Sequence, residues 1–136
     1  MSFLLDKERI RKFDLLRLVY FLTFLFSFAL TEIGRYIYRP YIYENNINDF
    51  GIADSMGNLG GIAVQIFFGL SILNPGRKKG KYLIGFFTVG YIVYEFLQPY
   101  LPKGTFDWKD IYGTVLGAAF SLLVFLIIHA LRKTKK

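Results

Sequence analysis

Carboxylate and amide side chains interrupt an otherwise apolar stretch of the sequence, residues 82–101. Glu95 and Gln98 lie three positions apart in it, and Asp107 and Asp110 follow shortly afterwards. A charged side chain at the centre of a bilayer costs about 2.5 to 3.5 kcal/mol on insertion scales, so an intramembrane carboxylate is a candidate functional group. Carboxylates and amides accept hydrogen bonds, so they suit a ligand that carries hydroxyl, amide or ammonium groups.

Two other apolar segments carry polar or small residues at helical spacing. Positions separated by three, four, seven or eleven residues share one face of a helix. In residues 54–73 this face holds Asp54, Asn58, Gly61 and Gln65. In residues 110–131 it holds Asp110, Thr114, Gly117 and Ser121. Lipid is a poor partner for such faces, so we expect them to turn toward one another.

The polar groups allow two interpretations. One hypothesis is that all the apolar segments contribute to a single polar site, to which the first segment adds Glu32 and Arg35. The alternative is that these groups only hold the helices together, with Glu32 paired to Arg35 and Glu95 capping a neighbouring hydrogen bond. In that case the loop acids face water, and Asp110 is favoured by the positive end of its helix. Small-xxx-small pairs, which let helices in lipid approach closely, are Gly57 with Gly61 and Gly113 with Gly117.

Composition and charge indicate an integral membrane protein. Of the 136 residues, 54% are hydrophobic and 19% aromatic, and the absence of cysteine excludes disulfides and thiolate chemistry. Thirteen of the 17 basic residues fall in three blocks, residues 7–17, 77–81 and 132–136, whereas most acids fall on the opposite side of the apolar segments. Because Lys and Arg mark the cytoplasmic side, both termini are predicted there. The basic blocks then serve topology and attraction to anionic lipids, and no nucleic-acid partner is expected.

The predicted fold is all-α, an integral membrane four-helix bundle formed by one domain, residues 1–136. The approximate spans are 16–38, 54–73, 82–101 and 110–131, each near the length of about 20 residues that a helical span needs. A turn is expected at Asn74, Pro75 and Gly76, and the longest connection is expected from Arg39 to Gly51. The predicted location is the bacterial cytoplasmic (inner) membrane, crossed several times.

Residues 54–131 resemble the VanZ-like family of small bacterial membrane proteins. The motifs that carry the resemblance are Asn58 in DSMGNLGG, Glu95 and Gln98 in YEFLQP, Asp107, and Asp110, Thr114 and Gly117 in DIYGTVLG. The chain departs from the family at Thr114, where asparagine is usual, and at Lys103 or Thr105, where arginine is common. It also lacks the Asp-Lys-x-x-His of the family, which is typical of a divergent member. The resemblance implies a cell-envelope role linked to glycopeptide (teicoplanin) resistance, and it implies no particular reaction.

Enzymatic activity is left uncertain by the residues and is less favoured than binding. Hydrolysis needs a nucleophile with a base, or a metal with an open position. The one histidine, His129, lies about a membrane thickness from the acids. Asp107 and Asp110 have the Asp-x-x-Asp spacing of some magnesium-dependent lipid enzymes, but the glycines and arginine expected around that motif are missing. No cofactor, metal or catalytic residue is therefore predicted.

The leading functional hypothesis is a binding site for a lipid headgroup or a lipid-linked cell-wall precursor. Its predicted residues are Glu95, Gln98, Asp107, Asp110, Asn58, Asp54 and Thr114, with Glu32, Arg35 and Gln65 in a secondary role. Two alternatives stay open. One is an accessory subunit of a larger envelope membrane complex. The other is a small ion or proton conduit formed by an oligomer, although little below Gln65 could carry an ion.

Overall fold

The described part of the chain, residues 7–11 and 13–134 of the computed structural model, contains helices and connections but no strand. The helices are α1 (Lys7–Arg11), α2 (Leu15–Ile33), the π-helical turn η1 (Gly34–Tyr38), α3 (Arg39–Glu44), α4 (Ile52–Leu73), α5 (Arg77–Leu97), the 3-10 turn η2 (Gln98–Tyr100) and α6 (Trp108–Lys133). This confirms the all-α prediction.

Three helices in the described residues are long and apolar enough to cross a membrane: Leu15–Glu44, Ile52–Leu73 and Trp108–Lys133. The first of them combines α2, η1 and α3 without a break. α5, which carries Lys81 and Glu95, is not among the three. It begins earlier than the predicted span 82–101, at Arg77, and ends earlier, at Leu97, where η2 follows.

The first long helix extends farther than its sequence suggested. Residues Arg39–Glu44, expected to begin a long connection, form α3, and only residues 45–51 remain as connection. Pro40 has no backbone N–H to donate, and the π-helical turn before it shifts the hydrogen-bond ladder so that the helix continues. Asp49 ends the connection, because its carboxylate accepts hydrogen bonds from the N–H groups of Gly51 and Ala53 at the start of α4.

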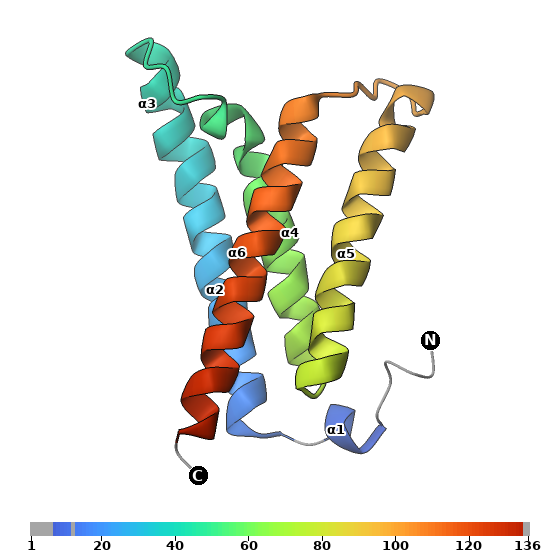
Figure 1. Ribbon diagram of the computed structural model, residues 1–136. Coiled ribbons are helices and arrows are strands. Elements are labelled where there is room, and N and C mark those ends of the chain that lie inside the picture. The colour runs from blue at the N-terminus through green and yellow to red at the C-terminus, as the bar shows by residue number, and fades with distance from the viewer. Residues whose placement is uncertain (1–6, 12, 135–136) are drawn as a thin grey trace.

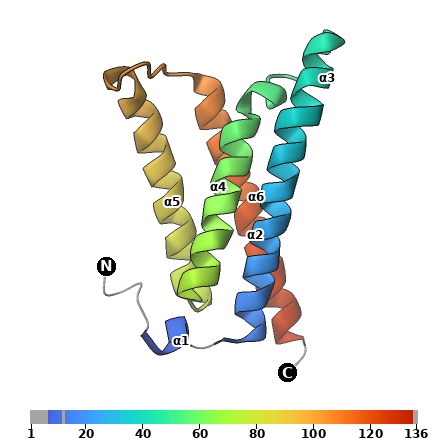
Figure 2. The same ribbon diagram turned by 180° about the vertical axis from the view of Figure 1, so that it is seen from behind.

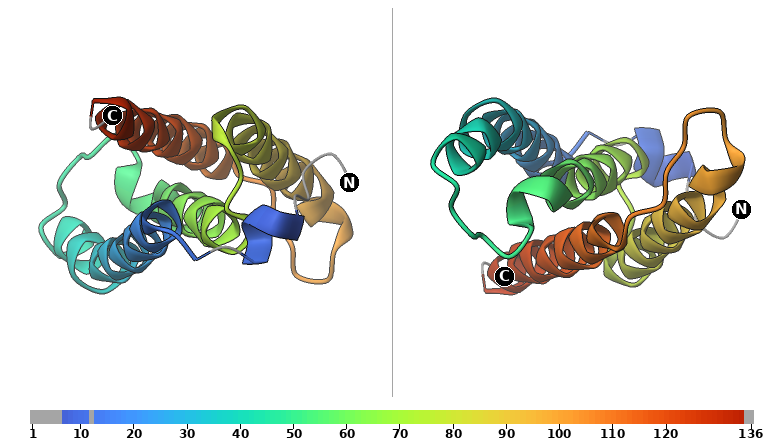
Figure 3. Two further views of the ribbon diagram at one scale, coloured as in Figure 1. Left: turned by 90° about the horizontal axis from the view of Figure 1, so that it is seen from below. Right: turned by 90° about the horizontal axis from the view of Figure 1, so that it is seen from above.

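α4 lies at the centre of the helical arrangement. It packs along both α2 and α6, and α5 packs against α6 and α4. Viewed along the helices, α2 and α4 form one layer and α6 and α5 the other (Figure 3). We call the end with the connections 45–51 and 101–107 the loop end, and the end with α1 and the last turn of α6 the terminal end. α5 and the α2–α3 helix lean apart toward the loop end (Figures 1 and 2).

Small residues set how closely these helices approach. A Cβ at Gly113 or Gly117 would collide with the backbone of α4 at Ser55 or Leu59, so this predicted pair is confirmed as a contact surface. Gly57 behaves differently, because a Cβ there would meet nothing within 4 Å. The closest approach of α4 to α2 depends instead on Gly60, whose missing side chain leaves room for Thr31.

The apolar core lies between the two layers. Its fully buried members are Tyr20 of α2, Ile62, Ile66, Phe67 and Leu70 of α4, and Phe125 of α6. The rings of Tyr20 and Phe125 stack with their centroids 6.2 Å apart, which joins α2 to α6 across the end of α4. Between helices in lipid, such side chains stabilise the contact through close van der Waals packing. The core therefore holds the helices together below the loop end.

Candidate functional site

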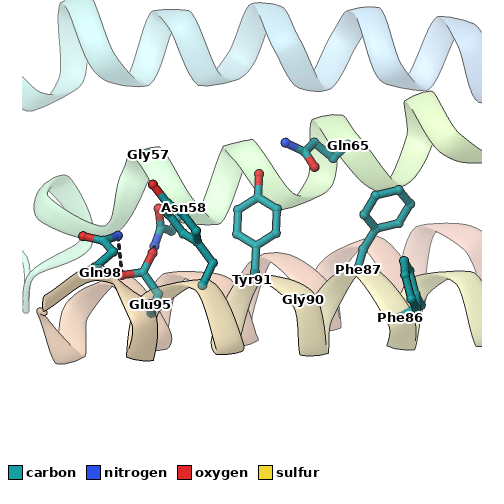
Figure 4. A pocket seen from close by; sticks show the side chains of 10 residues that line it. Gly57, Asn58, Gln65, Phe86, Phe87, Gly90, Tyr91, Glu95 and Gln98 are labelled. Atoms are coloured by element: carbon teal, nitrogen blue, oxygen red, sulfur yellow. Dashed lines mark hydrogen bonds between the residues drawn. The ribbon is translucent and has the colours of Figure 1, made fainter. Parts of the chain in front are cut away.

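Glu95 is the most deeply buried acid in the described structure. It lies on the last turns of α5 with 1% of its surface exposed. Asn58 of α4 donates from Nδ2 to Oε1 over 2.8 Å, and Gln98 donates from Nε2 to Oε2, also over 2.8 Å. Figure 4 shows the three side chains grouped at one end of a row. The bond from Asn58 joins two helices, whereas that from Gln98 is local.

The carboxylate has amide partners but no cationic one. The ion pairs within the described residues join Glu32 to Arg35 and Asp54 to Lys109, and neither includes Glu95. Each amide donates one of its two N–H groups to Glu95, and its oxygen keeps its capacity to accept. The carboxylate and the two amide oxygens can accept hydrogen bonds from a ligand with N–H or O–H donors, and the second N–H of each amide can donate in return.

A cavity of about 500 Å³ adjoins Glu95 between α4 and α5. Its lining changes character along its length: the amides and Glu95 lie at one end, Tyr91 and Gln65 lie in the middle, and the rings of Phe86 and Phe87 lie at the other end (Figure 4). Glycine at positions 57 and 90 leaves its walls open. We call this cavity the amphipathic groove.

The turn after α5 fixes the position of Gln98. The N–H of Leu101 donates to the carbonyl oxygen of Gln98 over 2.9 Å. Gly104 then approaches that carbonyl so closely that a Cβ would overlap it, which requires glycine at this position. Phe106 stacks on Phe96 with centroids 5.5 Å apart and meets Trp108 edge to face with centroids 5.1 Å apart, which holds the same connection against the end of α5.

Four of the predicted site residues line the groove together: Glu95, Gln98, Asn58 and Gln65. Gly61, on the same face of α4, lies opposite the hydroxyl of Tyr91. The groove thus draws on α4 and α5 and not on all four long helices, contrary to the hypothesis of a single shared site. The face of α6 that carries Gly117 packs against α4 instead.

The remaining predicted residues have other surroundings. Asp54 accepts hydrogen bonds from the Tyr43 hydroxyl and the Lys109 ammonium, which ties α3, α4 and α6 together at the loop end. Asp107 caps α6 by accepting from the N–H of Lys109 over 2.9 Å. Asp110 lies in the first turn of the same helix and is half-buried.

Thr114 and the pair of Glu32 and Arg35 complete the set. Thr114 is fully buried, and its hydroxyl oxygen has no hydrogen-bond partner within the described chain. Glu32 at the end of α2 and Arg35 of η1 form the predicted ion pair, with 3.5 Å between Oε1 and Nη1, on a partly exposed surface. Neither Thr114 nor this pair lines the groove.

The aromatic lining of the groove was missed as part of the site. Phe87, Tyr91, Glu95 and Gln98 follow one another at spacings of four, four and three residues, so they share one face of α5. That spacing was the available signal. Tyrosine is common at membrane surfaces as part of an interfacial aromatic belt, so the residue type of Tyr91 does not by itself indicate a site.

The chemistry of the site has to be inferred from its own residues, because no family model, curated protein or solved structure matches this chain. No group of His, Cys, Asp or Glu suited to a metal ion occurs among the described residues. His129 lies at the terminal end, bonded to Tyr20, and not beside Glu95. The groove can thus accept hydrogen bonds at one end and hold apolar groups at the other.

Proposed function

We propose that all four long helices span a bacterial inner membrane, with the terminal end in the cytoplasm. The three apolar helices support this placement, and α5 packs along two of them. Most Lys and Arg residues lie at the terminal end, as the charge rule for cytoplasmic segments requires. In this placement α5 contributes the fourth span of the bundle, and Glu95 lies in the outer half of the membrane.

We further propose that the amphipathic groove binds a lipid headgroup or a lipid-linked cell-wall precursor that carries ammonium or hydroxyl donors. The observation that supports this most strongly is the buried Glu95, which has two amide donors and no cation. An ionised group without a cation partner in an apolar surrounding is destabilising. A donor-rich ligand would offset that penalty by charge-assisted hydrogen bonds, which are roughly twice as strong as neutral ones.

The shape of the groove favours a lipid over a water-soluble ligand. Its volume falls within the usual range of about 300 to 1,000 Å³ for small-molecule sites. The donors of a headgroup would meet Glu95 and the two amide oxygens, while an acyl or prenyl chain would lie along Phe86 and Phe87 toward the membrane centre. The polar groups of the groove end at Gln65, which favours a binding site over a conduit.

A cell-envelope role follows from this ligand class. A protein that holds an envelope lipid or precursor at the outer leaflet could change its availability to a glycopeptide, in line with the VanZ-like resemblance of residues 54–131. We therefore include glycopeptide resistance in the proposal. In cells, Glu95→Ala and Gln98→Ala are expected to abolish that phenotype while leaving the amount of protein in the membrane unchanged. Loss of the protein itself would favour a purely structural role.

Lipid binding can be tested with matched headgroups. The purified chain in neutral detergent is offered phosphatidylethanolamine, phosphatidylcholine with the same acyl chains, or a glycolipid with an uncharged sugar headgroup, and bound lipid is counted by native mass spectrometry. Phosphatidylcholine serves as the control because its quaternary ammonium has no N–H to donate. We expect at least one donor-bearing lipid to bind more tightly than phosphatidylcholine.

The variant Glu95→Gln is expected to weaken that binding about tenfold or more, since a hydrogen bond to a charged group contributes about 1.5 to 3 kcal/mol. The matched control is Glu32→Gln, which makes the same chemical change on the surface of α2, outside the groove. Equal binding of both donor-bearing lipids by Glu95→Gln and by the unaltered chain would refute the proposal.

A further inference from the structure

Another cavity, of about 310 Å³, lies at the terminal end, whereas Glu95 of the amphipathic groove lies near the loop end. It is lined by Arg9 of α1, Arg77 at the start of α5, and His129, Arg132 and Lys133 in the last turns of α6. These residues come from three separate parts of the sequence. We call this cavity the basic pocket.

The wall formed by α1 is held in place by hydrogen bonds to the end of α4. Arg9 donates from Nε to the carbonyl oxygen of Asn74 over 2.9 Å. In return, Asn74 donates from Nδ2 to the carbonyl oxygen of Arg9 over 3.4 Å. The guanidinium of Arg17 adds bonds to the carbonyl oxygens of Ser71 and Ile72. Arg9 is thus fixed beside the last turn of α4 and takes part in a defined pocket.

His129 forms a buried part of the pocket lining. It is 8% exposed, and its Nε2 lies 2.8 Å from the hydroxyl of Tyr20, which is completely buried. A buried hydroxyl needs an acceptor, and Nε2 is the partner that Tyr20 has. With Nε2 accepting, the proton of the neutral ring lies on Nδ1, so that nitrogen is a donor. His129 therefore contributes a polar ring to the lining, beside the N–H groups of the basic side chains.

Positive charge exceeds negative charge around the pocket: Asp14 is close enough for the charges of Arg132 and Arg9 to act on it, but four basic side chains line the pocket. Arg77, Arg132 and Lys133 form no ion pair with a carboxylate in the described part of the chain. Like charges brought close together repel one another, so an anion that enters the pocket would relieve that repulsion. Guanidinium groups bind phosphate in a bidentate manner, which adds geometric specificity to the attraction.

We infer that the basic pocket is a binding site for a phosphate group, either that of an anionic lipid headgroup or a free phosphate ion. This inference goes beyond the proposed function, because the basic pocket would bind an anion, whereas the amphipathic groove would bind a ligand with N–H or O–H donors. The groove presents acceptors, whereas the pocket presents donors and positive charge. Basic pockets at the cytoplasmic side of membrane helices are suited to phosphate-bearing headgroups. This is a defined site and not a diffuse attraction between the basic blocks and the membrane.

Two variants with equal loss of charge separate a site from diffuse attraction. The pocket variant is Arg77→Gln with Arg132→Gln. The control variant is Arg11→Gln with Lys78→Gln, which are exposed residues at the same end that do not line the pocket. The unaltered chain and both variants are purified in neutral detergent. Binding of a fluorescent short-chain phosphatidic acid is measured by anisotropy, with and without inorganic phosphate as competitor.

We expect the pocket variant to bind the phosphatidic acid more than tenfold more weakly than the control variant, which should match the unaltered chain. If inorganic phosphate displaces the phosphatidic acid, the phosphate group alone is sufficient for binding. If the phosphatidic acid binds and inorganic phosphate does not displace it, the ligand is the lipid. Equal weakening in both variants, or no binding by the unaltered chain, would overturn the inference. If the pocket variant does not fold, Arg77→Lys with Arg132→Lys keeps the charge but removes the bidentate geometry, and an unchanged affinity there would count against it.

Discussion

The hydrogen bond between Asn58 and Glu95 is expected to stabilise the contact between α4 and α5 by a measurable amount. Its donor and acceptor are 2.8 Å apart, and Glu95 is 1% exposed. A bond to a charged group contributes about 1.5 to 3 kcal/mol. Interhelical hydrogen bonds in membrane proteins average about 0.6 kcal/mol and reach about 1.7. A carboxylate acceptor in a water-poor surrounding places this bond at the upper end, so we expect a coupling of about 1.5 kcal/mol.

A double-mutant cycle measures that coupling. The four proteins are the unaltered chain, Asn58→Ala, Glu95→Ala and the combination, and the unfolding free energy of each is measured by titration with a denaturing detergent. Trp108 is the one tryptophan of the chain, and its ring contacts Phe96 of α5, so its fluorescence reports separation of α5 from α6. The control is a second cycle in which Gln98→Ala replaces Asn58→Ala. The bond from Gln98 to Glu95 joins residues three positions apart and does not join α4 to α5.

The result that would refute this reasoning is specific. A coupling between Asn58 and Glu95 at or below the average of about 0.6 kcal/mol would mean that this bond is no stronger than an ordinary interhelical hydrogen bond. It would refute the stronger coupling expected for a charged acceptor. An equal effect of the Asn58 and Gln98 cycles on Trp108 fluorescence would contradict an interhelical role for the first bond alone.

Two further predictions concern packing and pH. Gly117→Ala is expected to lower the unfolding free energy by about 1 to 3 kcal/mol, because the added methyl group would overpack against Leu59. Gly57→Ala is expected to raise the unfolding free energy by up to about 1 kcal/mol, because alanine favours the helix more than glycine does. Titration of both variants with a denaturing detergent measures these changes, and equal changes would contradict the packing of α6 on α4. Burial alone would raise the pKa of Asp14, but hydrogen bonds from Arg17 and Asn74 and the charges of Arg132 and Arg9 bring that pKa below its ordinary value of 3.8. The stability that Asp14 contributes should therefore be complete above about pH 4 and be lost as the pH falls through the lowered value, and thermal melts should show less acid sensitivity in Asp14→Asn, which keeps a capping side chain.

Much of the helical arrangement could be predicted from periodicity and charge. The apolar segments became α4 and α6 nearly as expected, and the turn at Asn74, Pro75 and Gly76 separates α4 from α5. The cluster of Glu95, Gln98 and Asn58 was also predicted, because each residue is polar in an apolar segment. The position of a polar residue within an apolar segment is enough to identify it as a candidate, since a buried polar group requires a partner.

Other features depend on which neighbour a helix face meets, and spacing does not determine that. Thr114 and Gly117 share a face, as predicted, but the face packs on α4 and does not join Glu95 in the groove. The helix at Arg39–Glu44 was missed because residues 39–51 show little apolar periodicity, whereas in the structure the first long helix continues through a π-helical turn into α3. The basic pocket was missed because Arg9 and His129 meet only after folding.

The length of the first long helix has a consequence for the proposed membrane placement. Its 30 residues span about 45 Å at 1.5 Å per residue, whereas the hydrocarbon layer is about 30 Å thick. Such hydrophobic mismatch is relieved when a helix tilts or its end emerges into the headgroup region. The emerging turn would be α3, which is joined to Asp54 of α4 through Tyr43. The tilt of this helix should therefore vary with bilayer thickness, and Tyr43 would transmit that tilt to the end of α4 where the groove begins.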